Sequence, residues 1–147
     1  MSTVFAHHHF RVRVYYEDTD AGGMVYHANY LRYAERARTE ALRDLGVPHA
    51  DLVRDCNLMF VVRRAKVDYL RPARLDDSLD IVTEPLVLRA AAVTLRQDIR
   101  GLLGSCAVAE IELACVMLDA PRPARIPPRW RAAFVAMLAA RALAEKE

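Results

Sequence analysis

The region between residues 58 and 118 restricts the fold more than any other feature of the sequence. Four strand-like segments follow one another there, at residues 58–70, 78–88, 91–100 and 104–118. The connections between them are short and contain turn-forming residues, whereas parallel neighbours need crossovers of a dozen or more residues. We therefore predict an antiparallel sheet. The last two segments are long and largely apolar, so we expect them near its middle.

Helical periodicity precedes and follows these strands. Residues 29–45 repeat apolar positions at helical spacing, and Gly46 is typical of the position after a helix. Residues 49–55 fit a short helical turn, and residues 129–145 predict a C-terminal helix. Its apolar stripe consists of Trp130, Phe134, Met137 or Leu138, and Ala142. The order of elements predicts an α+β domain, with a helix laid across a curved antiparallel sheet.

An acidic loop leads into the first of these helices. Residues 10–16 alternate between apolar and polar side chains, which predicts a short strand whose buried face ends at Tyr16. Three acidic residues between 17 and 20 and an Ala-Gly-Gly turn follow. A carboxylate is thus placed close to the unpaired N–H groups of a helix start, which suit an oxyanion. This loop is the best candidate for chemistry, and spacing alone leaves both Asp18 and Asp20 as its acting carboxylate.

Length and charge favour a single ordinary domain over residues 1–147. The 21 basic and 19 acidic residues leave a net charge of +2, so no nucleic-acid partner is expected. Neither an export signal nor a membrane span is visible, and Cys56, Cys106 and Cys115 are too scattered for a disulfide framework, so we expect a cytoplasmic protein. Three adjacent histidines at residues 7–9 cannot all face one ion from an extended chain, and we expect no metal or other cofactor.

Several motifs bring a family to mind. The sequence from Tyr16 to Tyr30, YEDTDAGGMVYHANY, together with Glu35-Arg36-Ala37-Arg38 and residues 68–74, resembles the hotdog-fold acyl-CoA thioesterases. Within them it is most similar to the YbgC group, which is associated with the Tol–Pal cell-envelope system, and more distantly to 4-hydroxybenzoyl-CoA thioesterase. The resemblance spans roughly residues 10–130. It implies one central helix wrapped by about five antiparallel strands, and hydrolysis of an acyl-CoA to free acid and CoA.

The resemblance also implies roles for residues of the loop. Asp20 matches the family's catalytic carboxylate, which acts as a base on water or as a nucleophile. The backbone N–H of His27 matches the donor that polarises the thioester carbonyl, and its side chain matches a histidine that is thought to assist. Tyr26 matches a pocket-lining aromatic position. The chemistry of the loop agrees in part with these roles. Thioester hydrolysis needs a base or nucleophile and donors for the developing oxyanion, and an aspartate with helix N-terminal amides supplies both without a serine or a metal.

Coenzyme A has phosphates, so we expect basic side chains beside the cleft. The candidates are Arg63, Arg64, Lys66, Arg71 and Arg89. Related proteins pair their sheets edge to edge, so a homodimer or homotetramer is expected. An acyl carrier protein or Tol–Pal-linked envelope proteins are further candidate partners. Two alternatives stay open: a hotdog hydratase or dehydratase, against which the Asp-x-Asp-Ala-Gly loop argues, and a non-catalytic acyl-carrier or envelope-complex binding module.

Overall fold

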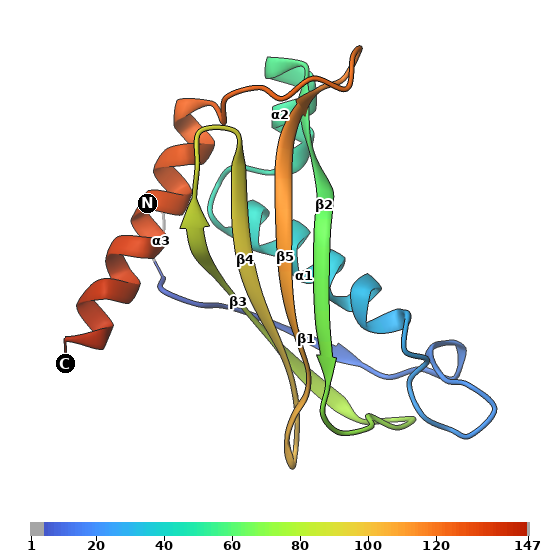
Figure 1. The fold of residues 1–147 in the computed structure, drawn as a ribbon. Coiled ribbons are helices and arrows are strands. Elements are labelled where there is room, and N and C mark those ends of the chain that lie inside the picture. The colour runs from blue at the N-terminus through green and yellow to red at the C-terminus, as the bar shows by residue number, and fades with distance from the viewer. Residues whose placement is uncertain (1–4, 147) are drawn as a thin grey trace.

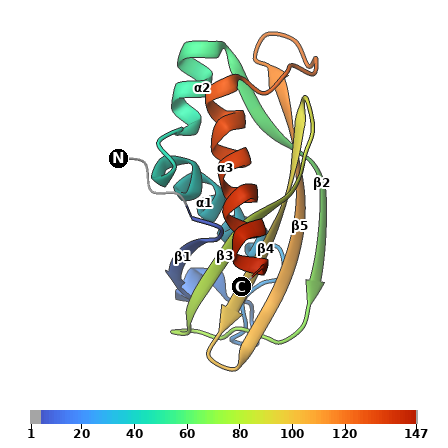
Figure 2. The same ribbon diagram turned by 90° about the vertical axis from the view of Figure 1, so that its left-hand side faces the viewer.

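The computed structural model describes residues 5–146 and contains a five-stranded sheet with its three α-helices on one face (Figures 1 and 2). The strands are β1 (His8–Arg13), β2 (Leu58–Tyr69), β3 (Ser78–Leu88), β4 (Ala92–Gly101) and β5 (Gly104–Met117). The helices are α1 (Asn29–Asp44), α2 (His49–Cys56) and α3 (Pro128–Glu145), and a single 3-10 turn, η1, spans Tyr16–Asp18. The predicted fold of a central helix, a curved sheet and a C-terminal helix is confirmed.

The strands lie in the order β1-β3-β4-β5-β2, and every neighbouring pair is antiparallel. The last two strands of the chain, β4 and β5, therefore have neighbours on both sides, as their apolar sequences predict. β1 and β2 form the two edges. The outer face is charged: Glu110 of β5 stands in register with Lys66 of β2 on one side and with Arg96 of β4 on the other.

The helices cover the sheet through two apolar clusters. Beside the first half of α1, Tyr33 packs with Leu79, Ile81 and Ile99, all of which are fully buried. The second cluster lies under α2 and α3; it includes Leu52, Ile111, Trp130 and Phe134. The small side chains of Ala34 and Ala37 are also fully buried. Alanines at these positions let α1 lie close to the sheet.

The C-terminal helix α3 is anchored at its first turn. Trp130 is buried, and its indole Nε1–H donates a hydrogen bond of 3.0 Å to the Val47 carbonyl in the connection between α1 and α2. Phe134 and Met137 continue the buried face, which confirms the predicted stripe as far as Met137. Ala142, its last predicted member, is exposed because α3 extends beyond the apolar cluster there. Within residues 5–146, no helix is long and apolar enough to cross a membrane.

The first strand differs from its prediction. β1 ends at Arg13, and Tyr16 is exposed on η1. The cause is local hydrogen bonding, because the Asp18 carboxylate accepts the Tyr15 N–H at 2.8 Å and so turns the chain out of the sheet. Val14 remains buried and its N–H bonds to the Asp77 carbonyl. The apolar alternation of the sequence therefore continues to Val14, one residue beyond Arg13, the last residue of β1 that pairs with β3.

Candidate active site

The acidic loop folds as a small hairpin against the segment that precedes β3. Thr19 and Val25 form an isolated antiparallel bridge, and the Asp20 N–H donates to the Met24 carbonyl at 2.8 Å. The Val25 N–H in turn donates to the Ala73 carbonyl, also at 2.8 Å. The loop is therefore tied to the sheet through its backbone.

Asp20 is exposed, and its carboxylate is held in one orientation. Its Oδ1 accepts the N–H of Gly22 at 2.8 Å and that of Met24 at 3.3 Å. A glycine suits position 22 because the backbone there passes close to the Asp20 carboxylate. A Cβ at this position would lie 3.3 Å from Oδ1. Gly23 has a φ of +78°, which favours glycine. No side chain or backbone donor among residues 5–146 bonds to the other carboxylate oxygen, Oδ2.

Helix α1 begins without a capping side chain. Its N-cap position is Ala28, whose side chain has no oxygen to offer to the first N–H groups. In the described part of the chain, the N–H groups of His27 and Ala28 find no acceptor, while the Asn29 N–H donates to the Tyr26 carbonyl at 2.8 Å. Free donors at a helix start also benefit from the positive end of the helix dipole. This end of α1 therefore suits an oxyanion.

Asp18 occupies the opposite environment from Asp20, although only one residue separates them. It is 6% exposed, and its carboxylate accepts the Tyr15 N–H at 2.8 Å and the Asn29 side-chain amide at 3.0 Å. The buried Tyr33 hydroxyl lies beside the same carboxylate, although without full hydrogen-bond geometry. The Asp18 carbonyl also accepts the Tyr26 N–H at 2.9 Å. Asp18 therefore joins the loop to the start of α1.

These contacts set the ionisation of Asp18 and Tyr33. Burial acts to raise the pKa of Asp18, but the Tyr15 N–H, the neighbouring Tyr33 and Asn29 side chains and the charge of Arg36 outweigh it, so its pKa lies below the usual value. Burial and the adjacent carboxylate raise the pKa of Tyr33. The carboxylate is thus ionised and the phenol neutral. Both oxygens of Asp18 are thus engaged, which favours a structural role for this side chain. Sequence spacing alone did not distinguish it from Asp20.

Aromatic side chains surround the helix start. The rings of Tyr26 and His27 have centroids 4.5 Å apart, and the Tyr69 ring lies edge-on to His27 at 6.4 Å. The Tyr69 hydroxyl donates to the His27 carbonyl at 3.0 Å, which fixes the end of β2 next to the loop. Tyr26 and His27 are both exposed. Tyr69 was not among the predicted site residues, because its place beside the loop depends on tertiary packing.

The five predicted phosphate-binding side chains do not form one group. Arg63 and Arg89 both contact Glu112, at 2.8 and 3.3 Å, and therefore tie the middle of β2 and the β3–β4 turn to β5. Arg64 and Lys66 are exposed on the edge strand β2, with no carboxylate partner among residues 5–146. Arg71 lies beyond the end of β2, in a separate cleft.

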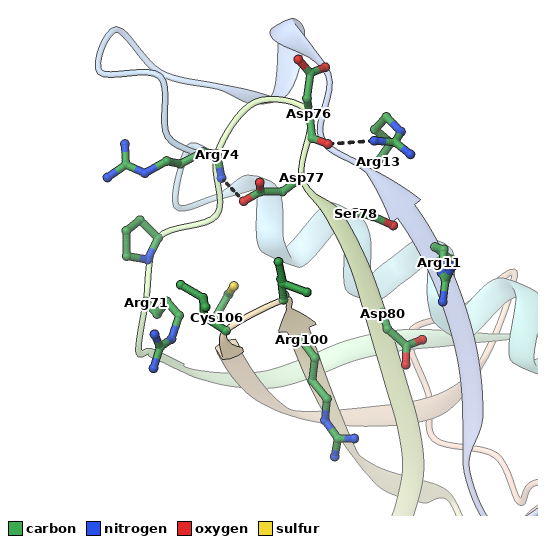
Figure 3. A pocket seen from close by; sticks show the side chains of 14 residues that line it. Arg11, Arg13, Arg71, Arg74, Asp76, Asp77, Ser78, Asp80, Arg100 and Cys106 are labelled. Carbon is green, nitrogen blue, oxygen red and sulfur yellow. Dashed lines mark hydrogen bonds between the residues drawn. The ribbon is translucent and has the colours of Figure 1, made fainter.

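We call this separate feature the arginine cleft. It has a volume of about 960 Å³ and lies at the end of the sheet where β1 and β3 meet the 71–77 segment and the β4–β5 hairpin (Figure 3). Five arginines line it: Arg11, Arg13, Arg71, Arg74 and Arg100. The outward-facing arginines of the first strand were visible in the sequence, but the other three come together only through the turn after β2.

The three histidines at residues 7–9 each face a different carboxylate. His7 contacts Glu84 at 2.8 Å, His8 contacts Asp44 at 2.7 Å, and His9 contacts Asp80 at 2.9 Å; these distances join a ring nitrogen to a carboxylate oxygen. The three side chains do not converge. Between residues 5 and 146, no group of three or more His, Cys, Asp or Glu side chains has the arrangement of a metal site.

The fold and the loop together define a thioesterase of the hotdog type. A family model described as the thioesterase-like superfamily matches residues 14–134, and the chain belongs to this family. The chain is 43% identical to the acyl-CoA thioesterase YbgC of Haemophilus influenzae over 85% of its own length and 92% of that protein. It is 44% identical to the acyl-CoA thioester hydrolase YbgC of Escherichia coli O6:H1, covering 80% of this chain and 84% of that one.

Solved structures agree with this placement. A probable thioesterase from Bartonella henselae has 37% sequence identity and a TM-score of 0.78, covering 82% of this chain and 99% of the other. The DHNA-CoA thioesterase of Staphylococcus aureus superposes with a TM-score of 0.86 over 94% of this chain and 95% of that chain. Its sequence identity is 22%, so this second likeness concerns the fold alone.

Proposed function

We propose that this protein is an acyl-CoA thioesterase in which Asp20 acts on the thioester and the His27 backbone N–H polarises its carbonyl. The relatives named as acyl-CoA thioesterases at 43–44% identity support the reaction class. One observation supports the roles of the residues. An exposed carboxylate with a free oxygen is held by the backbone of a loop that leads directly into an uncapped helix start.

Two routes lead to the same products. If Asp20 is a base, it takes a proton from water while the hydroxide oxygen bonds to the carbonyl carbon. If Asp20 is a nucleophile, its Oδ2 bonds to that carbon and water later hydrolyses the mixed anhydride. In both routes the C–S bond breaks, the sulfur leaves as thiolate and takes up a proton, and one water is consumed. The products are a free acid and CoA.

The helix start stabilises the charge that develops on the thioester oxygen. The tetrahedral intermediate of either route has an oxyanion, and the His27 N–H is free to donate to it without prior rearrangement. Loss of one such donor typically costs about 10²–10³-fold in kcat. Tyr26 and the His27 ring line the approach to this donor, and in this proposal they contact the substrate beside the reacting carbonyl.

The test is thiol release from a panel of acyl-CoAs by the wild-type protein and by Asp20→Asn. This substitution keeps the size of the side chain and removes the charge, so kcat should fall by about two orders or more while KM stays near the wild-type value. Asp119→Asn is the matched control, since Asp119 is exposed and makes no ion pair within residues 5–146. It should behave as wild type.

Three results would contradict parts of this proposal. Binding of acyl-CoA without thiol release by the wild-type protein would make it a binding module. If Asp20→Asn stays within about tenfold of wild type while Asp18→Asn is inactive but folded, the acting carboxylate is Asp18. If neither variant loses activity, the loop is not the site.

A further inference from the structure

The arginine cleft has more positive charge than its surroundings neutralise. The guanidinium groups of Arg11, Arg71 and Arg74 bond to no acceptor within the part of the chain that the structure describes. Arg13 donates only to the Asp76 carbonyl, at 2.8 Å, whereas Arg100 forms an ion pair with Asp98, also at 2.8 Å. Four of the five guanidinium groups therefore have no carboxylate partner.

The aspartates that line the cleft are turned to other groups. The Asp77 carboxylate accepts the backbone N–H of Arg74 at 2.8 Å, and Asp80 contacts His9 at 2.9 Å. The Asp76 carboxylate points away from the arginines in Figure 3. None of these three carboxylates forms an ion pair with a guanidinium group of the cleft. An anion of the phosphate class would supply the oxygen acceptors that these groups lack, in the paired geometry that arginine favours.

A projecting apolar hairpin borders the cleft. Leu102 is 99% exposed and Leu103 is 76% exposed, and both also line the cleft. They form the connection between β4 and β5, where Gly101 and Gly104 are paired. Gly104 has a φ of +125°, which allows the tight return. The hairpin extends beyond the other strands at the lower end of Figure 1, and most of the surface of its two leucines is in contact with solvent.

We propose that the arginine cleft and the Leu102–Leu103 hairpin together bind the surface of a membrane that contains anionic phospholipids. The guanidinium groups bind headgroup phosphates, and the two leucines enter the boundary between headgroups and acyl chains. Charge complementarity favours an anionic surface. The shape of the hairpin favours lipid over protein, because a projecting apolar pair fits a deformable interface without a preformed pocket. The protein would bind such a surface from outside the bilayer.

The experiment is vesicle flotation of the full-length protein. One set of vesicles is pure phosphatidylcholine, and the other contains about 30% phosphatidylglycerol. The wild-type protein should float with the anionic vesicles only, and less at 0.5 M than at 0.05 M salt, because salt screens the arginines. Arg11→Gln/Arg74→Gln should lower partitioning about tenfold or more and remove most of the salt dependence. Leu102→Ser/Leu103→Ser should lower it by a similar factor and leave the salt dependence.

Matched controls come from distant parts of the chain. Arg122→Gln removes an exposed arginine from the connection after β5, and Leu143→Ser removes a leucine on α3 that is 66% exposed. Both should partition as wild type. The proposal is overturned if wild type does not float with anionic vesicles, or if the cleft and hairpin variants bind no more weakly than these controls. It is also overturned if the leucine variant dissociates an oligomer in sedimentation while vesicle binding is unchanged, which would make the hairpin a contact between copies.

Discussion

At the scale of single residues, two aspartates of one loop have opposite environments. Asp18 is buried and uses both carboxylate oxygens to bond to Tyr15 and Asn29. Asp20 is exposed and uses one oxygen for the loop, with the other free. The buried group therefore fixes the backbone that holds Asp20, and in the proposed mechanism Asp20 acts from this position. Substitution of either should reduce activity, but through different causes.

The first prediction concerns Asp18→Asn. The amide removes a charged acceptor from two hydrogen bonds and presents an N–H₂ group to donors, so we expect a loss of about 1.5–3 kcal/mol in the free energy of unfolding. For a chain of this size that corresponds to a decrease in Tm of roughly 4–10 °C. Thermal unfolding followed by circular dichroism measures it. An Asp18→Asn variant as stable as wild type would show that the buried contacts of Asp18 do not stabilise the fold.

The same carboxylate predicts part of the acid sensitivity. Its folded pKa lies below the ordinary value of 3.8, so its stabilising contribution is fully present above that value and is lost as pH falls through the folded pKa. Denaturant unfolding at a series of pH values between about 2 and 7 should therefore show a steeper loss of stability below about pH 4 for wild type than for Asp18→Asn. Equal slopes would assign the acid sensitivity to other carboxylates.

The sequence predicted the residues of the loop better than their environments. The spacing of the acidic residues and glycines indicated a carboxylate beside a helix start, and both are present. The burial of Asp18 depends on Tyr33, which lies 15 positions away and faces the loop only once α1 has packed on the sheet. Tyr69 is a similar case, because the end of β2 reaches His27 only through the tertiary fold.

At the scale of elements, the strands and helices followed from periodicity, whereas the end of β1 followed from a side-chain hydrogen bond. β3 has the residues that the alternation predicts, and α1 ends directly before the Leu45-Gly46 turn. β1 is shorter because the Asp18 bond interrupts it, a contact that no periodicity can indicate. The sequence also did not indicate which charged residues of different strands would form ion pairs. Arg63 and Arg89 meet at Glu112 because β5 lies between β2 and β4.

Because Arg63 and Arg89 are paired with Glu112, the prediction for substrate binding is best tested at the two unpaired basic residues of β2. Arg64 and Lys66 have no carboxylate partner in the described chain, so their charges can be removed without breaking an ion pair. If they contact CoA phosphates in both the ground state and the transition state, Arg64→Gln/Lys66→Gln should raise KM several-fold at low salt and leave kcat nearly unchanged. Steady-state thiol release measures both constants. Arg122→Gln is the control, and a collapse of kcat with constant KM would remove these residues from recognition.

The anchoring of α3 gives a second prediction at this scale. Trp130 is 2% exposed and bonds to the Val47 carbonyl, so Trp130→Ala leaves a cavity and an unpaired acceptor. We expect a loss of about 3–5 kcal/mol in the free energy of unfolding. Val135 on the same helix is 50% exposed, and Val135→Ala should change stability by less than about 0.5 kcal/mol. Urea titrations of both variants test this, and a small effect at Trp130 would mean that α3 packs loosely.

At the scale of the whole molecule, the isolated chain exposes more surface than a compact monomer of its mass. Its accessible surface is 8649 Å², whereas folded monomers of 16.6 kDa average about 7,600 Å². The difference, about 1,000 Å², is close to the roughly 800 Å² that each partner buries in a standard interface. β2 is a long edge strand, and Val62, Tyr69 and the adjacent Leu70 are 50%, 50% and 60% exposed. A long edge strand that exposes apolar side chains in this way is usually covered by another chain.

We therefore predict at least a dimer, formed at the β2 edge. Tyr69 lies on this strand and contacts His27, so a partner at the edge would also border the candidate active site. Val62→Lys places a charge on the edge and should weaken self-association by about tenfold or more, together with activity, whereas Val135→Lys, at an equally exposed valine of α3, should not. Sedimentation velocity at micromolar concentration measures both. A wild-type monomer that still hydrolyses acyl-CoA would refute the prediction, because the edge would then be stable uncovered and the site complete within one chain.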